Sequence, residues 1–157
     1  MPRILGIDFG TRRVGAAISD PRRSIASPLE VYERRDPIQD AKHYRVLMEE
    51  NEVERIVIGL PVHLTGREGT SASLARTWGD WLHASTAVPV VYYDERYTTV
   101  DAEASMIAAG LKRSKRKGLV DMLAARLLLQ NYLDDGCPET ASSSQPIADS
   151  ASESEAT

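Results

Sequence analysis

The sequence of 157 residues has a single cysteine, few aromatic residues and no long apolar stretch. With only Cys137, the chain cannot close an internal disulfide, which excludes the disulfide-rich secreted domains. No apolar run approaches the ~20 residues that a helix needs to cross a bilayer, so a membrane-spanning role is excluded. The first residues contain no apolar signal-peptide segment either, so we expect a cytoplasmic protein. The length fits one domain with its own core.

The distribution of charge divides the chain into two parts. The whole sequence has 19 Lys and Arg residues against 23 Asp and Glu residues, a formal net charge of −4. Six of the acidic residues lie from Asp134 onward, where there is no Lys, Arg or aromatic residue. The remaining 17 acidic and 19 basic residues give the rest of the chain a net charge of about +2. We therefore expect a mildly basic folded domain, residues 1–133, and an acidic disordered tail, residues 134–157.

The pattern of apolar residues predicts the order of the secondary structure elements. Short β-branched or alternating runs predict five strands, and apolar residues at helical spacing predict helices. We expect strands at 3–9, 14–19, 24–32, 55–60 and 88–93, and helices at 38–51, 70–84, from about 98, and 119–133. Pro28 favours an edge position or a bulge in the third strand. Two right-handed crossovers then give an α/β fold with a mixed sheet of order 3-2-1-4-5, in which the first three strands are antiparallel.

Three acidic residues converge on one edge of this predicted sheet. Asp8 ends the first strand, Glu95 follows the fifth, and Asp121 is expected in the first turn of the last helix. The small side chains of Ala124 and Ala125 would let this helix approach the sheet closely. Three neighbouring carboxylates repel one another unless divalent cations lie between them, and hard oxygen ligands suit Mg²⁺ or Mn²⁺. The sequence therefore predicts a metal site at this edge.

Each of these acids also has a purely structural explanation. Asp8 could form an ion pair with an arginine such as Arg12 or Arg96. Glu95 could be a solvated residue at the end of a strand, and Asp121 could serve only the dipole of its helix. The metal site is the better interpretation because it accounts for all three acids at once.

A basic segment lies directly before Asp121 in the sequence. Its cations are Lys112, Arg113, Lys115, Arg116 and Lys117. A charged run is often only a solvated face, but an anionic polymer cannot approach three carboxylates without compensating cations. We therefore predict that this segment binds the phosphate backbone of a nucleic acid. Arg12 and Arg13, between the first two strands, are expected to add phosphate contacts.

Two other features are interpreted structurally. The glycine-rich segment 59–69, which contains Pro61, is expected to form a loop over the substrate. Trp78 and Trp81 lie three residues apart on a predicted helix, which favours a packing role over a base-stacking platform.

Four sequence blocks carry a family resemblance. They are Asp8 to Gly15, Ile58 to Pro61 with Gly66 to Gly69, Asp94 to Thr99, and Lys115 to Ala125. In order and spacing they resemble the YqgF/RuvX family of Holliday junction resolvases, which has a ribonuclease H-like fold. The resemblance covers nearly all of residues 3–133. The first block alone is weak, because Asp-x-Gly-Thr also opens the phosphate-binding hairpin of the actin and sugar-kinase superfamily.

The resemblance implies a metal-dependent nuclease that matures the 5′ end of pre-16S rRNA and cuts branched DNA. Asp8, Glu95 and Asp121 would be its catalytic residues and the ligands of two Mg²⁺ or Mn²⁺ ions, with Asp94 as the alternative to Glu95. Glu95 is preferred because it lies further past the strand and has the longer side chain. The implied partners are pre-rRNA or branched DNA and the ribosome, with no membrane, and the protein would be a monomer or a homodimer.

One departure weakens the junction-cutting half of this inference. Resolvases of the related RuvC group place a glutamate at the end of the fourth strand, where this sequence has residues 59–61, Gly-Leu-Pro. Two alternatives also stay open. One is a catalytically silent module that binds RNA or the ribosome. The other is an ATP-dependent phosphotransferase, which would need two ribonuclease H-like halves where residues 1–133 supply one.

Overall fold

The computed structural model describes residues 2–61, 69–95 and 113–139, with side chains for all of these except residues 61, 95 and 113–118. The predicted helix from about residue 98, most of the predicted loop and residues 140–157 lie outside the described residues.

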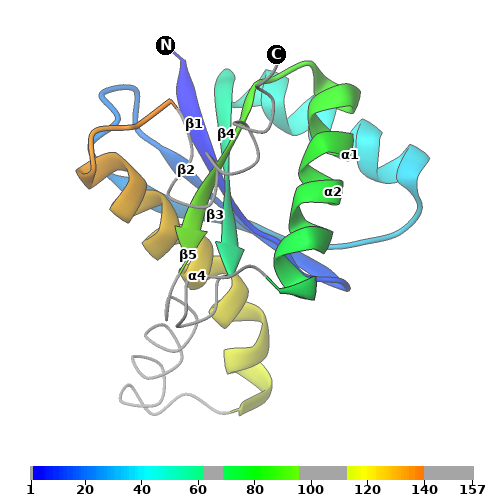
Figure 1. Ribbon diagram of the computed structural model, residues 1–157. Coiled ribbons are helices and arrows are strands. Elements are labelled where there is room, and N and C mark those ends of the chain that lie inside the picture. Colours follow the sequence, from blue (N-terminus) through cyan, green and yellow to red (C-terminus); the bar gives the residue numbers. More distant parts are fainter. Residues whose placement is uncertain (1, 62–68, 96–112, 140–157) are drawn as a thin grey trace, which may run out of the picture.

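A mixed five-stranded sheet forms the centre of the fold (Figure 1). Its strands are β1 Arg3–Asp8, β2 Arg13–Ser19, β3 Ala26–Glu33, β4 Val53–Pro61 and β5 Val90–Glu95. The strand order is β3-β2-β1-β4-β5, with β2 antiparallel to β1 and β3, and β4 parallel to β1 and β5. The predicted α/β fold and strand order are therefore confirmed. The edge strand β3 also carries the expected irregularity, because its register with β2 shifts next to the pair Ala17 and Pro28.

Helices cover both faces of the sheet (Figure 1). They are α1 Pro37–Glu50, α2 Thr70–Thr86 and α4 Arg113–Asp134. Helices α1 and α2 pack on one face, where Leu5 and Ile7 of β1 are fully buried. Helix α4 packs on the other face over β1, β2 and β3, with Ala125 and Leu129 fully buried. Among the described residues, no helix combines the length and the apolar character needed to cross a membrane.

Local sequence signals explain where α1 begins and where α4 ends. Asp36 caps α1 by accepting the backbone N–H of Gln39 at 2.9 Å, and Pro37 occupies the first turn, where its missing N–H is harmless. At the other end of the chain, Gly136 adopts φ 91° after α4, while the N–H groups of residues 136 and 137 bond back to the carbonyls of Leu133 and Tyr132. This pair of bonds is the Schellman motif, which favours glycine at that position.

The beginning of α4 corrects the sequence-based expectation. The helix begins at Arg113, not near residue 119, so Asp121 lies in its third turn and not in its first. The apolar periodicity only begins near Leu119, but Lys and Arg are good helix formers and extend the helix through the basic segment. Asp121 is therefore too far from the helix start to serve its dipole, and that alternative explanation is wrong.

A second correction concerns the beginning of the predicted loop at residues 59–61. These residues belong to β4, where Gly59 pairs with Tyr93 and Leu60 pairs with Asp94. The glycine and proline had suggested a loop, but Leu60 is fully buried and the parallel pairing with β5 continues to Pro61.

The first residues of the predicted tail contact the folded domain. Tyr132 donates its hydroxyl hydrogen to the carbonyl oxygen of Pro138 at 2.5 Å, and Arg55 Nη1 donates to the carbonyl of Cys137 at 3.3 Å. Arg55 thereby fastens the end of α4 to β4. Disorder from residue 140 onward stays a prediction.

Candidate metal-binding site

Asp8 and Asp121 lie on either side of one glycine. In the antiparallel pair of β1 and β2, Asp8 is the partner of Gly15. A Cβ atom added to Gly15 would lie 2.1 Å from the backbone oxygen of Asp121 and 3.1 Å from its Cβ atom. Helix α4 therefore rests directly on β2 at Gly15, where only glycine leaves enough room. This contact places the two acidic residues next to each other although they come from opposite ends of the domain.

The same face of β1 meets α4 along its length. A Cβ atom on Gly6 would lie 2.7 Å from Leu129 Cβ and 3.3 Å from the backbone oxygen of Ala125. Because alternate residues of a strand share a face, Asp8 belongs to the face of Gly6, which α4 covers. The sequence-based expectation that small residues let α4 approach the sheet closely is confirmed, since Ala124 and Ala125 are both fully buried.

Arg13 holds the carboxylate of Asp121. Its Nε donates to Asp121 Oδ2 at 2.9 Å, and the two side chains are only 27% and 22% exposed. A partly buried, charge-assisted bond of this kind fixes the orientation of the carboxylate. The sequence predicts phosphate binding for Arg13, but it does not predict this contact, which joins residues 108 positions apart. Its one local signal is the spacing, because Arg13 lies two residues before Gly15 and so shares its face of β2.

Asp94 and residue 95 of β5 belong to opposite faces of the sheet. Tyr92 belongs to the α2 face, where its hydroxyl donates to Asp80 Oδ1 at 2.7 Å. Tyr93 belongs to the α4 face, where its ring lies 5.4 Å from that of Tyr132. Alternation along the strand then assigns Asp94 to the α2 face and backbone position 95 to the α4 face. The side chain of Glu95 lies outside the described part of the chain.

The two tyrosines of β5 have shifted ionisation. Burial and the hydrogen bond to Asp80 raise the pKa of Tyr92 well above its usual value. Burial, together with the hydrogen bond that its hydroxyl donates to Asp135 Oδ2 at 3.0 Å, raises the pKa of Tyr93 to about 12. Both hydroxyls therefore stay protonated at neutral pH and serve as donors that fix β5 to the helices.

The predicted metal ligands are assembled only in part by the described residues. Where side chains are described, no three His, Cys, Asp or Glu residues gather closely enough to hold a metal ion. Asp8 and Asp121, however, occupy adjoining backbone positions on one face of the sheet, and carboxylate oxygens are hard donors that suit Mg²⁺ or Mn²⁺. The donor chemistry thus fits a divalent cation, and the complete trio with Glu95 stays a prediction.

The basic segment begins α4. Arg113, Lys115, Arg116 and Lys117 lie within its first turns, whereas Lys112 lies outside the described residues. Lys117 precedes Asp121 by four positions, about one helical turn, so the backbone places the cationic end of α4 next to the acidic pair. Arg12 is exposed in the connection between β1 and β2.

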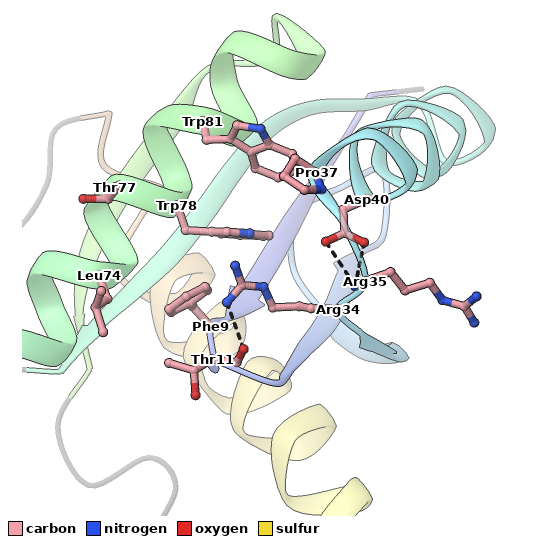
Figure 2. A pocket seen from close by; sticks show the side chains of 10 residues that line it. All are labelled: Phe9, Thr11, Arg34, Arg35, Pro37, Asp40, Leu74, Thr77, Trp78 and Trp81. Atoms are coloured by element: carbon pink, nitrogen blue, oxygen red, sulfur yellow. Dashed lines mark hydrogen bonds between the residues drawn. The ribbon is translucent and has the colours of Figure 1, made fainter.

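Arg34 braces this connection from the other side of the sheet, a role that sequence reasoning missed. Its guanidinium donates to the carbonyl oxygen of Thr11 at 3.0 Å and lies 5.1 Å from the centre of the Phe9 ring (Figure 2). No local pattern signals this role, because Arg34 reaches the hairpin from the end of β3. The segment that carries Phe9 and Thr11 directly follows Asp8, so Arg34 helps to fix the backbone next to the acidic pair.

Comparisons with known proteins show which family this chain is similar to. The model of the RuvX family, described as Holliday junction resolvase, matches residues 2–135. A relative from Halothermothrix orenii is 42% identical over 132 residues, which cover 84% of this chain and 94% of the relative. A relative from Heliobacterium modesticaldum is 43% identical over 132 residues, covering 84% and 89%. Both carry the name "Putative pre-16S rRNA nuclease".

Two solved structures share the fold. A Thermus thermophilus RuvC in complex with a Holliday junction substrate has a TM-score of 0.53 at 16% identity, over 87% of this chain and 97% of that chain. A fowlpox virus resolvase in complex with Holliday junction DNA also has a TM-score of 0.53, at 10% identity, over 85% and 97%.

Proposed function

This chain belongs to the RuvX family of Holliday junction resolvases, and from this membership we propose that it is a metal-dependent nuclease that matures the 5′ end of pre-16S rRNA. The choice of substrate follows the relatives that are 42% and 43% identical and carry that name, because the junction-bound structures are only 16% and 10% identical. We place its action in the cytoplasm, on the precursor of the small ribosomal subunit.

The observation that carries the proposal is the contact of α4 with β2 at Gly15, which sets Asp121 beside Asp8. We propose that these two residues and Glu95 hold the metal ions. Bound divalent ions supply the activation of a water molecule and the stabilisation of the leaving oxygen in phosphodiester hydrolysis. Register supports Glu95 as the third ligand, because position 95 falls on the α4 face and Asp94 on the α2 face.

The arginine and lysine residues around the proposed metal site orient its carboxylates and bind the substrate. Arg13 keeps the Asp121 carboxylate turned in one direction and balances part of its charge. We propose that the cations at the start of α4, with Arg12, attract the phosphate backbone that two or three carboxylates alone would repel. This division of roles needs no covalent nucleophile from the protein.

A cleavage assay with matched variants tests the proposal. A pre-16S rRNA fragment with its 5′ extension, a four-way DNA junction and single-stranded DNA are incubated with the wild type and with Asp8→Asn, in Mn²⁺ and in EDTA. We expect cutting of the RNA in Mn²⁺, no cutting in EDTA, and a loss of about 100-fold or more in the variant, since loss of a metal-binding carboxylate is costly. Cutting in EDTA, or unchanged cutting by Asp8→Asn, would contradict the mechanism.

The two neighbouring acids of β5 provide an internal control. Glu95→Gln is expected to lose activity in the same way as Asp8→Asn. Asp94→Asn, which changes the acid on the α2 face, is expected to keep most of it. The reverse order would show that Asp94 is the ligand. Preferred cutting of the four-way junction over the RNA would instead make junction resolution the main activity.

A further inference from the structure

A cavity of about 360 Å³ opens on the face of the sheet opposite to α4 (Figure 2). Its walls are largely apolar and include Phe9, Trp78, Trp81 and Pro37. The rings of Phe9 and Trp78 lie 5.2 Å apart at 35°, and those of Trp78 and Trp81 lie 5.9 Å apart at 40°. Trp78 is only 6% exposed and packs edge-on against the buried Tyr44. The predicted packing role is confirmed for Trp78, whereas Trp81 is only partly buried against the core and keeps part of its ring exposed at the cavity wall. We call this cavity the aromatic pocket.

A second, polar hollow of about 540 Å³ adjoins the aromatic pocket. The two share Thr11, Arg34 and Arg35, and Arg12 and Glu33 also line the hollow. The lining of the polar hollow therefore carries three guanidinium groups and one carboxylate, that of Glu33, so the hollow attracts anions. Arg34 is held in place by its bond to Thr11, whereas the side chain of Arg35 is exposed.

Asp40, which also lines the aromatic pocket, is already engaged by the protein. It is 4% exposed, and its Oδ1 accepts the Tyr32 hydroxyl at 2.7 Å and the backbone N–H of Arg35 at 3.0 Å. These bonds fix the carboxylate against the wall. Even with Asp40 counted, arginines outnumber acids around the two joined hollows.

The aromatic pocket lies just across the sheet edge from the acidic pair. Asp8 and Phe9 are consecutive residues, and Asp8 belongs to the α4 face while Phe9 packs with Trp78 on the other face. A flexible polymer that crosses the edge at the β1–β2 connection can therefore contact Asp8 on one side and the aromatic pocket on the other.

We propose that the aromatic pocket binds an unpaired base of the nucleic-acid substrate, with the neighbouring phosphate on the arginine-lined hollow. Flat aromatic walls beside guanidinium groups match the two halves of a nucleotide, and every base offers a π-face for stacking. A base inside a duplex is already stacked and cannot enter. The enzyme would thus recognise a single-stranded segment next to the bond it cuts. This inference rests on the proposed function for the nature of the polymer.

Intrinsic fluorescence gives a direct readout, because the chain has two tryptophans and both line this pocket. The full chain in EDTA, which prevents cleavage, is titrated with a short single-stranded adenosine oligoribonucleotide. An abasic oligonucleotide with the same number of phosphates and a blunt RNA duplex serve as comparisons. We expect quenching by the single strand only, and binding of the abasic strand that is about 5- to 100-fold weaker, as expected for the loss of one stacked base.

Variants of the pocket and a matched surface control complete the test. Trp81→Leu keeps an apolar side chain but removes a stacking surface, and is expected to weaken binding of the single strand without changing that of the abasic strand. Arg35→Ala should flatten the salt dependence of binding by about one unit of slope. Arg22→Ala removes an exposed arginine from the turn at the opposite end of β2, and should change neither quantity. Circular dichroism verifies that each variant is folded.

The outcomes separate this proposal from the nuclease proposal. In Asp8→Asn, the difference in quenching between the intact and the abasic strand is expected to remain, since the aromatic walls of the pocket are unchanged, even where the lost charge alters the affinity for both strands. Equal quenching by the abasic strand or by the duplex overturns the base pocket, as does binding detected by anisotropy without any change in tryptophan fluorescence. Normal cleavage without quenching would refute the pocket alone. Quenching without any metal-dependent cleavage would refute the nuclease alone.

Discussion

Replacing Gly15 with alanine tests the contact on which the proposed metal site depends. The added Cβ atom would lie 2.1 Å from the backbone oxygen of Asp121, whereas ordinary van der Waals contact begins at 3.4 Å. Helix α4 and strand β2 must therefore separate by the difference, about 1.3 Å. Overpacking of this kind destabilises a protein by about 1–3 kcal/mol. For a domain of this size we expect the melting temperature to fall by roughly 3–12 °C.

The larger effect of Gly15→Ala is expected on the site itself. Displacing a reacting group by about 1 Å costs on the order of 100-fold in rate, so cleavage should fall by that factor in protein that is still folded. Metal binding gives a second readout, because Mn²⁺ at about 100 times its dissociation constant should stabilise the wild type by about 2.7 kcal/mol. The variant should lose most of this Mn²⁺-induced rise in melting temperature.

Gly79→Ala is the matched control for this experiment. Its Cβ atom would lie 2.4 Å from the hydroxyl oxygen of Tyr92 and 2.7 Å from Ile58 Cδ1, so it disturbs the packing of α2 on the opposite face of the sheet. We expect a lower melting temperature but an unchanged stabilisation by Mn²⁺. If Gly15→Ala keeps both its melting temperature and its response to Mn²⁺, the close approach of α4 does not assemble the site and the reasoning is wrong.

Four further predictions address single features. Arg13→Ala should weaken Mn²⁺ binding and activity by about 10- to 100-fold through loss of the bond to Asp121, with partial rescue by Arg13→Lys; a change in melting temperature alone would reduce Arg13 to a structural role. Replacing Lys115, Arg116 and Lys117 together with alanine should flatten the salt dependence of nucleic-acid binding by up to about three units, and an unchanged slope would return them to a solvated face. Because the pKa of Tyr93 is raised from 10.0 to about 12, the folded state keeps a proton that the unfolded state loses; stability should be complete below pH 10.0 and fall as the pH rises toward 12, less so in Tyr93→Phe, as followed by alkaline denaturation. Deleting residues 140–157 should leave the melting temperature unchanged, whereas deleting residues 136–157 should lower it by removing the cap of α4 and the bonds from Tyr132 and Arg55.

The sequence predicts the sheet well because its strands are specified locally. Buried β-branched runs such as Ile56 to Ile58 mark the strands, and the handedness of crossovers predicts that β4 and β5 run parallel to β1, as the structure shows. The beginning of α4 was less predictable, because apolar periodicity marks the buried part of a helix only. The first turns of α4 are basic and show no apolar periodicity, so the sequence predicts too late a start for the helix and places Asp121 in its first turn.

The candidate site could be predicted in its residue types but not in its contacts. The acids at the ends of β1 and β5 follow from strand boundaries, which the sequence indicates. The contact of Gly15 with Asp121 and the bond from Arg13 depend on how α4 docks across β2, and no pattern within either segment specifies that docking. The choice between Asp94 and Glu95 needs the strand register, which the sequence-based argument from side-chain length did not use.

The origin of the two paired acids also orders events during synthesis of the protein. Asp8 leaves the ribosome among the first residues of the domain, and Asp121 arrives only with the last helix. Until α4 has emerged and docked, a growing chain holds one half of the acidic pair, so under the proposed mechanism we expect a partly translated or prematurely terminated chain to be inactive toward the RNA around it.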